Sequence, residues 1–387
     1  MIVTQTSYRL SLFGGGSDYP EWFREHGGSC LAATINKFCT ISARWLPPFF
    51  AHRNRIVWSK IELVKARSEI EHPAVRAALE MLDLDGVEIH HDGDLPARSG
   101  IGSSSAFAVG LLHALSGLLG IMAAPERLAE DAIRLERILG EHIGIQDQIL
   151  CALGGFRLLT IERDGMWRAY PVILGSETRR ALEERLLLFY TGPRAGDLGA
   201  ASGRVASRSG PENLALARIQ QMPAEALRLL DAADFHGFGE LLDESCWRKK
   251  ELGPGISTPE IDDLYATARR AGASGGKITG SGGGGFLLLC VEPQFQTSVL
   301  RTLAHLVHVP FCFESGGSRI AYYREEAKAM RRVVNVVTEY RWANEVGAHS
   351  MPHPDELRWL GFDFVLRDGQ PVRDPRYPES VLMRRDR

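Results

Sequence analysis

Hydrophobic and polar positions in the first part of the chain alternate as they do in half-buried strands, between shorter stretches with helical spacing. Gly14–Gly16 and Gly27-Gly28 interrupt these patterns and predict turns. A short helix is expected over 21–26 and another over 73–81. The strand-like segments are residues 7–13, 29–35, 38–45, 55–58, 86–90 and 156–161.

Two later stretches have the character of longer helices. Residues 106–115 are an unbroken apolar run without a polar face, which predicts a buried helix. Residues 125–139 begin with Pro at the first helical position and place Leu128, Ala132, Leu135 and Leu139 on one face. Glu136 flanks that apolar stripe instead of pointing directly to water.

The second half of the chain alternates helices and strands. Thr258 and Pro259 have the types expected at the N-cap and first position of a helix. Beyond residue 324 the pattern changes to a charged amphipathic helix followed by one candidate hairpin. The expected helices are 177–185, helices within about 211–252, 258–271, 294–306 and 325–346; the expected strands are 186–190, 286–289, 311–313, 319–323, 362–366 and 369–372.

Composition narrows the class of protein. A chain of 387 residues favours two domains, and 44% hydrophobic and 24% charged residues are ordinary for a globular protein. A net charge of -3 offers no basic face for nucleic acid. The N-terminus lacks a secretory pattern, no apolar run is long enough to span a bilayer, and the six cysteines form no C-x-x-C pair. We expect a cytoplasmic protein with reduced thiols and neither a membrane nor a nucleic acid as partner.

The segment just before the buried helix is the strongest candidate for chemistry. Pro96, Gly100 and Gly102 exclude regular structure, and Ser103–Ser105 then open the helix. Unpaired N–H groups at a helix N-terminus attract anions, typically phosphate, and serine hydroxyls can ligate Mg²⁺ beside it. The alternative is a serine N-cap on an ordinary core helix.

Two acidic positions and one turn add to this candidate. The turn Gly14–Asp18 follows a strand that carries Arg9; it could bind sugar hydroxyls, or be a hairpin turn with a surface Asp. Glu136 could be a metal ligand or the partner of an arginine. Asp147 lies in the polar stretch Gln146–Gln148, where it could accept the proton of an attacking hydroxyl or cap a helix.

A third glycine-rich segment, residues 275–285, predicts a loop of bare backbone that can approach another loop closely. Gly272–Lys277 is not a Walker A motif, because the spacing is too short and Ile278 stands where Ser or Thr is needed. Gly280–Gly285 fits the dinucleotide-binding string, but a strand follows it where a helix is required.

In this order, the three glycine segments resemble the three motifs of the GHMP small-molecule kinases. The resemblance covers residues 3–324 and implies an α+β fold of two domains: a ribosomal-protein-S5-domain-2-like domain (1–175) and a ferredoxin-like domain (176–324). Residues 325–387 are then an extension that packs against the body of the protein or against the second copy of a homodimer.

The resemblance also implies roles for individual residues, with ATP as the donor and Mg²⁺ as the metal. Asp147, eleven residues after Glu136, is implied as the catalytic base, and Arg9 as the group that steadies the transferred phosphoryl. Ser104 and Glu136 are implied as Mg²⁺ ligands. The implied ATP-binding residues are Pro96, Gly100, Ile101, Gly102, Ser103, Ser104 and Ser105; the implied substrate-binding residues are Asp18, Gly15, Gly16, Ser17, Gly282 and Gly283.

Within residues 3–324, the chain resembles most strongly the bacterial D-glycero-D-manno-heptose 7-phosphate kinases, which phosphorylate the anomeric hydroxyl of a sugar phosphate. The expected activity is therefore that of an ATP-dependent sugar kinase making a heptose 1,7-bisphosphate. Those relatives place a basic residue and an aromatic where this chain has Ile145 and Ile149. This difference leaves open a 1-kinase for another sugar, of the L-fucose or octose phosphate type. A non-catalytic regulator with the same fold is a separate alternative.

Overall fold

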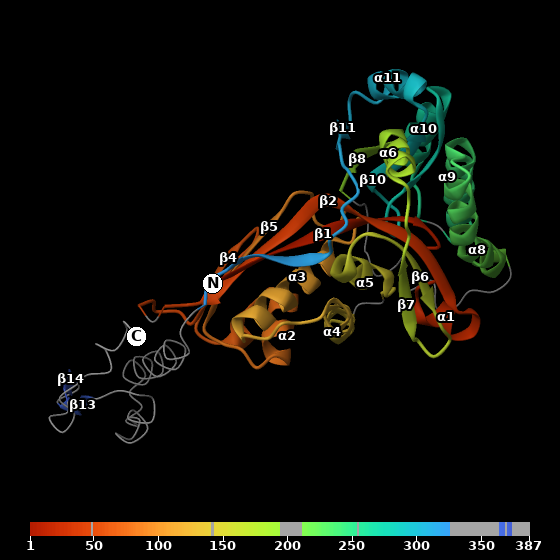
Figure 1. Cartoon of the computed structure of the whole chain (residues 1–387). Helices are drawn as coiled ribbons and strands as arrows, with labels where there is room; N and C mark the ends of the chain where they lie inside the picture. The colour runs from red at the N-terminus through yellow and green to blue at the C-terminus, as the bar shows by residue number, and fades with distance from the viewer. Residues whose placement is uncertain are drawn as a thin grey trace.

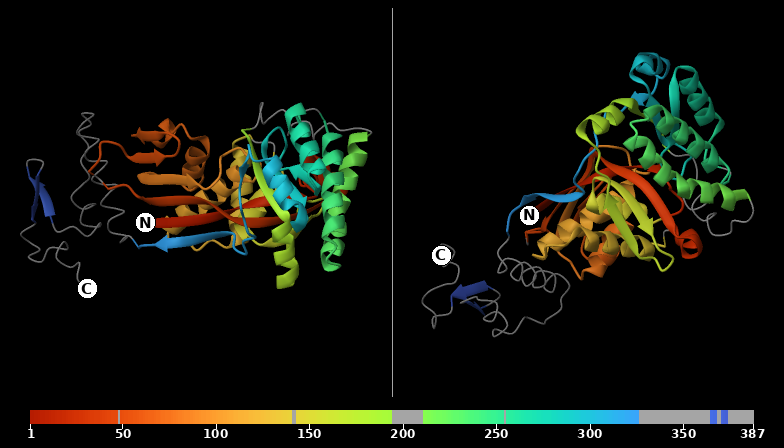
Figure 2. Two further views of the ribbon diagram at one scale, coloured as in Figure 1. Left: turned by 90° about the horizontal axis from the view of Figure 1, so that it is seen from above. Right: turned by 45° about the vertical axis from the view of Figure 1, so that its right-hand side comes forward.

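The computed structural model describes residues 1–47, 49–140, 143–193, 211–253 and 255–325, and the backbone of 364–367 and 370–373. Within these residues, a large sheet occupies one part of the molecule and a smaller sheet lies beyond one end of it (Figures 1 and 2).

The large sheet has eight strands among the described residues. Its path is β12-β1-β2-β5-β3-β4, with β6 paired to β2 and β7 paired to β6; all pairs are antiparallel except β3 with β5. The strands are β1 (Ile2–Phe13), β2 (Gly28–Trp45), β3 (Asn54–Val57), β4 (Ile61–Val64), β5 (Val87–Gly93), β6 (Phe156–Ile161), β7 (Trp167–Pro171) and β12 (Ser318–Tyr323).

The prediction of two strands in 29–35 and 38–45 is wrong, because β2 is one strand of 18 residues. Its first part pairs with β6 and its last part with β5, while β1 pairs along both parts. Because β1 pairs with β2 on both sides of Asn36 and Lys37, the backbone of β2 stays extended through these two residues. β4 and β7 were not expected from the sequence.

Helices cover one face of the large sheet: α2 (Pro73–Met81), α3 (Ser103–Leu118), α4 (Pro125–Ile138) and α5 (Gln146–Leu153) (Figure 1). The prediction of a buried helix is confirmed, since every residue of α3 from Ser105 to Leu115 is buried. The buried face of α4 includes Leu128, Ala132 and Leu135 as predicted, and Glu136 with them. The short helix α1 (Pro20–His26) follows the first glycine turn, and a single 3₁₀ turn spans Arg67–Glu69.

The smaller sheet has the order β11-β8-β10-β9 and is antiparallel. Its strands are β8 (Leu186–Gly192), β9 (Ala273–Ile278), β10 (Gly285–Val291) and β11 (Val307–His308). The accompanying helices are α6 (Ser176–Arg185), α8 (Pro211–Asp231), α9 (Phe235–Lys250), α10 (Pro259–Arg270) and α11 (Pro293–Thr302). Thr258 caps α10 as predicted, accepting a hydrogen bond from Ile261 N at 3.3 Å.

The loop expected over 275–285 is shorter than predicted, because residues 275–278 belong to strand β9. A Cβ on Gly275 would lie 1.8 Å from the carbonyl oxygen of Gly239 in α9, and one on Gly276 2.4 Å from that of Leu288 in β10. These glycines therefore allow helix and strands to pack at backbone distance. The strand expected over 311–313 is reduced to one bridge between Phe313 and Ile35.

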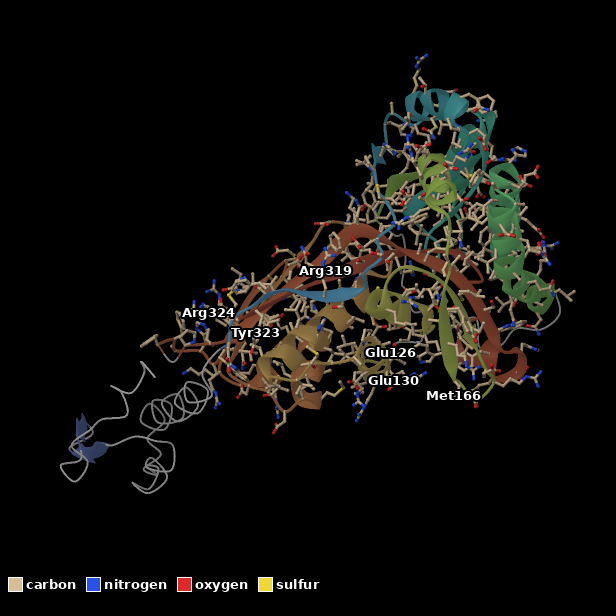
Figure 3. All side chains as sticks on the ribbon, viewed as in Figure 1. Glu126, Glu130, Met166, Arg319, Tyr323 and Arg324 are labelled. Atoms are coloured by element: carbon tan, nitrogen blue, oxygen red, sulfur yellow. The ribbon has the colours of Figure 1, made fainter. Side chains whose placement is uncertain are left out.

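The end of the described chain returns to the large sheet. β12, assigned from sequence to the second domain, pairs with β1 and forms an edge of the first sheet. Figure 3 labels Arg319 and Tyr323 on this strand and Arg324 just after it. The helix predicted over 325–346 lies outside the described residues. The predicted hairpin is confirmed as β13 (Phe364–Arg367) paired with β14 (Gln370–Arg373).

The six cysteines are free thiols, and all but Cys312 are buried. In the part of the chain that the structure describes, no helix combines the length and the apolar character that crossing a bilayer requires.

Candidate active site

The loop before α3 presents backbone donors at its helix end. Gly102 has the left-handed φ of 73°, and the first intrahelical bond runs from Ala106 N to Gly102 O at 2.8 Å. The N–H groups of Ser103–Ser105 therefore precede the helical hydrogen-bond ladder. The Ser103 hydroxyl accepts a bond from Arg98 N at 3.0 Å, and Ser104 is exposed whereas Ser105 is buried. This end of α3 therefore offers backbone N–H donors of the kind that suit an anion.

The third glycine segment packs against this loop, as the sequence predicted. A Cβ on Gly100 would lie 2.5 Å from the carbonyl oxygen of Thr279, and one on Gly285 2.2 Å from that of Ser99. The Thr279 hydroxyl also donates to Ser99 O at 3.3 Å. Gly282 and Gly283, in contrast, lie against Ile256, to whose carbonyl Gly283 N donates at 3.0 Å.

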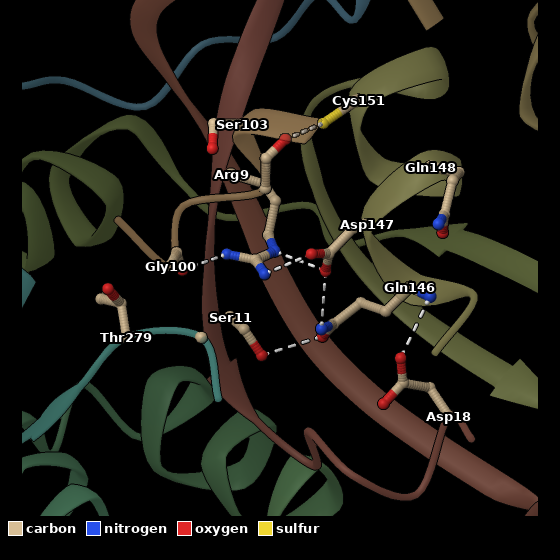
Figure 4. A network of polar contacts seen from close by, with 12 residues as sticks. Arg9, Ser11, Asp18, Gly100, Ser103, Gln146, Asp147, Gln148, Cys151 and Thr279 are labelled. Carbon is tan, nitrogen blue, oxygen red and sulfur yellow. Dashed lines mark hydrogen bonds and ion pairs between the residues drawn. The ribbon is translucent and has the colours of Figure 1, made fainter. Parts of the chain in front are cut away.

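Arg9 and Asp147 form a two-pronged ion pair beside the loop (Figure 4). Arg9 Nε donates to Asp147 Oδ1 at 2.7 Å and Nη2 to Oδ2 at 2.5 Å, while Nη1 donates to Gly100 O at 2.8 Å. Arg9 is 3% exposed; burial acts to lower its pKa, but the Asp147 carboxylate outweighs this and raises it. One guanidinium thus joins the predicted base to the predicted phosphate loop.

Asp18 is buried, not on the surface. Its Oδ1 accepts a bond from Gly16 N at 2.9 Å and its Oδ2 from Gln146 N at 3.2 Å, so the carboxylate holds the first turn and the N-terminus of α5 together. The side chain is 4% exposed. Burial and the charge of Asp147 raise the pKa of Asp18, against the lowering effect of these backbone donors.

The other residues of the first turn shape its backbone. The hydroxyl of Ser17 is fully buried, and its one proton has two carbonyl acceptors within reach, Gly14 O at 2.8 Å and Ser29 O at 2.9 Å. Gly16 has a φ of 104° and, like Gly15, is partly exposed. Ser17 is therefore committed to the turn, and Gly15 and Gly16 are the turn residues open to a ligand.

Glu136 lies at the end of α4 and is 2% exposed. Its Oε2 accepts a hydrogen bond from Gln148 Nε2 of α5. Among the described residues, no group of three or more His, Cys, Asp or Glu side chains could hold a metal ion. The predicted ligands, a carboxylate and the Ser104 hydroxyl, are both oxygen donors and so suit Mg²⁺, which usually completes its shell with substrate phosphates and water.

Three residues of this neighbourhood were missed by the sequence reasoning. Ser11 and Gln146 connect Asp18 to Asp147 through hydrogen bonds, and Lys277 enters from the other sheet. Arg9 and Ser11 are two apart on β1, so strand periodicity could have placed both on the face that carries the site. Gln146 stands in the motif already singled out. The contact of Lys277 with β1 spans 265 residues and left no local signal.

Lys277 of β9 extends to β1, where its Nζ donates to Leu12 O at 2.9 Å. It is 4% exposed. Burial lowers its pKa to about 8, and the nearby charge of Arg9 acts in the same direction. A cation of the second sheet thus contacts β1 two residues before the first glycine turn.

Family models for both halves of a kinase match this chain. The model described as GHMP kinases N terminal domain matches residues 62–155, and the model GHMP kinases C terminal matches residues 226–301. The two lie in the predicted order and include the phosphate loop and the third glycine segment. The chain belongs to the GHMP kinase family. It is therefore a kinase with the two-domain α+β fold of that family, as the sequence predicted.

Several relatives of this GHMP kinase are known. D-glycero-alpha-D-manno-heptose 7-phosphate kinase of Campylobacter jejuni is 26% identical over 78% of this chain and 93% of its own length. L-fucokinase/L-fucose-1-P guanylyltransferase of Bacteroides fragilis is 28% identical over 56% of this chain and 24% of its own length. A D-glycero-D-manno-heptose 1-phosphate kinase structure from Bacteroides thetaiotaomicron superposes with a TM-score of 0.68 and 23% identity, over 84% of this chain and all of that one, and shows the shared fold.

The departure noted at positions 145 and 149 falls in the core of this kinase. Ile145 is 3% exposed and Ile149 is fully buried. Ile145 contributes its backbone N–H, which donates to Asp18 O at 3.2 Å. At these two positions, therefore, the side chains offer no charge to an acceptor.

Proposed function

We propose that this kinase transfers the γ-phosphoryl group of ATP to the anomeric hydroxyl of a heptose 7-phosphate, giving the 1,7-bisphosphate. The observation that carries the proposal is the Arg9 guanidinium, which binds both oxygens of Asp147 and the carbonyl of Gly100. It ties an acid suited to receive a hydroxyl proton to the loop suited to hold phosphates. The match to a heptose 7-phosphate kinase along 93% of its length supports the choice of acceptor.

On the nucleotide side, we assign the phosphates to the loop Pro96–Ser105. The N–H groups of Gly100, Ile101, Gly102 and the serines hold their oxygens, and the contact with Thr279 and Gly285 fixes the loop from behind. Transfer of a phosphoryl group depends mainly on position and on neutralised charge. Arg9 supplies a fixed positive charge at this point.

Ser104 and Glu136 are the residues that would hold Mg²⁺ in this proposal. Bound there, the ion would neutralise charge on the phosphates. The contact of Gln148 with Glu136 orients the carboxylate from the α5 side.

On the acceptor side, we assign Asp18 with the backbone of Gly15 and Gly16, and the third segment through Gly282 and Gly283. Each oxygen of Asp18 accepts one backbone N–H, and a carboxylate oxygen can accept a second hydrogen bond. Asp18 can therefore orient a sugar hydroxyl while it continues to hold the turn. Asp147, 27% exposed, is the carboxylate that takes the proton from the attacking hydroxyl.

Two observations favour a second acceptor. Positions 145 and 149 carry buried isoleucines, and the similarity to a fucokinase covers more than half of this chain. A 1-kinase for a sugar such as L-fucose, or for an octose phosphate, is the alternative. The non-catalytic role considered from the sequence is set aside, because the chain is a GHMP kinase that retains both acids.

The test is an ADP-release assay of the purified protein with ATP, Mg²⁺ and single acceptors. The panel contains D-glycero-D-manno-heptose 7-phosphate, the free heptose and L-fucose. NMR of the product's anomeric carbon then shows whether phosphate is attached there. Turnover highest with the heptose 7-phosphate supports the proposal; a preference for L-fucose, or a product phosphorylated at another carbon, overturns it.

A further inference from the structure

We propose that Gln146 is a positioning residue of the transfer reaction, held by Ser11, which keeps the acceptor-side carboxylate of Asp18 and the base Asp147 at a fixed separation. The inference rests on the proposed roles of Asp18 and Asp147. It assigns a task to two side chains to which neither the family resemblance nor the proposed transfer step gives a role.

Three contacts place Gln146 between the two acids (Figure 4). Its backbone N donates to Asp18 Oδ2 at 3.2 Å, and its side-chain Nε2 donates to Asp147 Oδ1 at 3.4 Å. Its Oε1 accepts a bond from the Ser11 hydroxyl at 3.0 Å. Gln146 is 4% exposed and Ser11 6%, so water competes little for these bonds.

Ser11 determines which way the amide of Gln146 faces. A hydroxyl at Oε1 directs Nε2, a donor, toward the carboxylate of Asp147. If the amide turned over, its oxygen would face that carboxylate and repel it. Since Arg9 already occupies both oxygens of Asp147, Gln146 adds a bond in a second direction and restricts rotation of the carboxylate about the ion pair.

Removing this restraint should reduce turnover more than binding. Gln146→Met keeps the length and neutrality of the side chain but loses both of its hydrogen bonds. We expect kcat to fall about tenfold to a hundredfold, because small misplacements of reacting groups have effects of this size, while KM for ATP changes little. Ser11→Ala should lower kcat in the same sense, and the double variant should be no worse than Gln146→Met alone.

Gln146→Glu provides a readout that a purely structural role would not move. It puts a second carboxylate against Asp147, and like charges at this range raise the pKa of an acid. The acid limb of the kcat profile should therefore move up by about one pH unit, whereas in Gln146→Met it stays in place. The control is Gln5→Glu on β1, the strand that carries Ser11, because the Gln5 side chain accepts a hydrogen bond from Arg319 at 3.2 Å instead of facing the site.

The same shift can be measured without an acceptor, by a ¹³C-carboxyl NMR titration of Asp147, assigned by the signal lost in Asp147→Asn. If no sugar is phosphorylated by the wild type, the proposed function fails while this titration still tests Gln146. An Asp147 titration that Gln146→Glu leaves unmoved overturns the inference. So does a Gln146→Met enzyme with wild-type kcat, and single-variant effects that simply add in the double variant.

Discussion

At the scale of single residues, the arrangement of Arg9 around Asp147 decides how the acid can work. Both carboxylate oxygens accept N–H bonds from one guanidinium that also reaches Gly100. This geometry orients the Asp147 carboxylate, and it places positive charge beside the loop where phosphates are expected. The acid and the phosphate loop should therefore depend on each other.

Replacing Asp147 by Asn tests that dependence. The amide cannot take a proton, and its NH₂ group would face one of the Arg9 donors, so we expect kcat to fall by roughly 10² to 10⁴ with KM for ATP within a few-fold. ADP release under saturating ATP measures the loss. Glu240→Gln on the exposed side of α9 is the matched control. An Asp147→Asn enzyme with full turnover would remove the base assignment.

The buried side chain of Lys277 predicts how the stability of the fold depends on pH. Its pKa is lowered from 10.5 to about 8 in the folded protein. Below pH 8 the ammonium is charged in both states and its burial destabilises the fold. Between about pH 8 and 10.5 the unfolded chain binds more protons, so this penalty is relieved and the free energy of unfolding rises with pH, by roughly 3 kcal/mol in total.

Lys277→Met should remove that rise and be at least as stable as the wild type at pH 7. Urea unfolding at pH 7, 8, 9 and 10 measures the difference between the two proteins. The control is Lys60→Met, whose ammonium is half exposed. A wild type and a Lys277→Met variant with parallel pH dependence would contradict the buried charge.

At the scale of elements, the hydrophobic pattern of a segment predicted its structure correctly where the spacing within that segment alone determines which residues are buried. The apolar run of α3 and the stripe of α4 are such cases, and both helices lie where predicted. β9 was missed because its glycines are explained by the backbone of α9 and β10, which contact it from elsewhere in the chain. β4 has four residues at a sheet edge with two side chains exposed, so its pattern is too short to distinguish.

The candidate site likewise contains parts that the sequence predicted and parts that it did not. The glycine spacing singled out the loop before α3, the first turn and the third segment, and the structure brings that loop and the third segment together. The hydrogen bonds that join Ser11, Gln146 and Asp147 could not be predicted from the sequence, because they depend on the distance between β1 and α5 in the folded protein. The burial of Asp18 was equally hidden, since its partners are backbone N–H groups whose sequence carries no information.

The contact between the loop before α3 and the third glycine segment can be tested by a substitution at Gly100. Gly100→Ala would place a Cβ 2.5 Å from Thr279 O in a residue with φ of 83°. Gly120 also has a positive φ, 73°, but no atom within 4 Å, so Gly120→Ala measures the cost of backbone conformation alone, about 1–2 kcal/mol. We expect Gly100→Ala to be less stable than Gly120→Ala and to bind ATP more weakly, measured by thermal unfolding and calorimetry. Equal effects of the two substitutions would mean that the loops do not rely on each other.

At the scale of the whole molecule, the second half of the chain supports the site from two directions. β9 and β10 hold the phosphate loop through Thr279 and Gly285, and the chain then returns as β12 to pair with β1, the strand that carries Arg9. Ser318 fixes that return, because its hydroxyl lies 2.9 Å from both Thr6 Oγ1 and His113 Nδ1. β12 is therefore part of the scaffold of the site, although it comes after the second sheet in sequence.

Two truncations separate the contribution of β12 from that of residues 326–387. Residues 1–325 include both sheets and every residue assigned to the site, so we expect this protein to fold and to keep kcat within a few-fold of the full chain. Residues 1–317 lack β12, which leaves the backbone of β1 unpaired at the edge and removes both bonds of Ser318. That protein should aggregate or lose most of its activity. Thermal unfolding, light scattering and ADP release on the two proteins measure the difference, and a fully active 1–317 protein would show that β1 holds Arg9 in place without its neighbour.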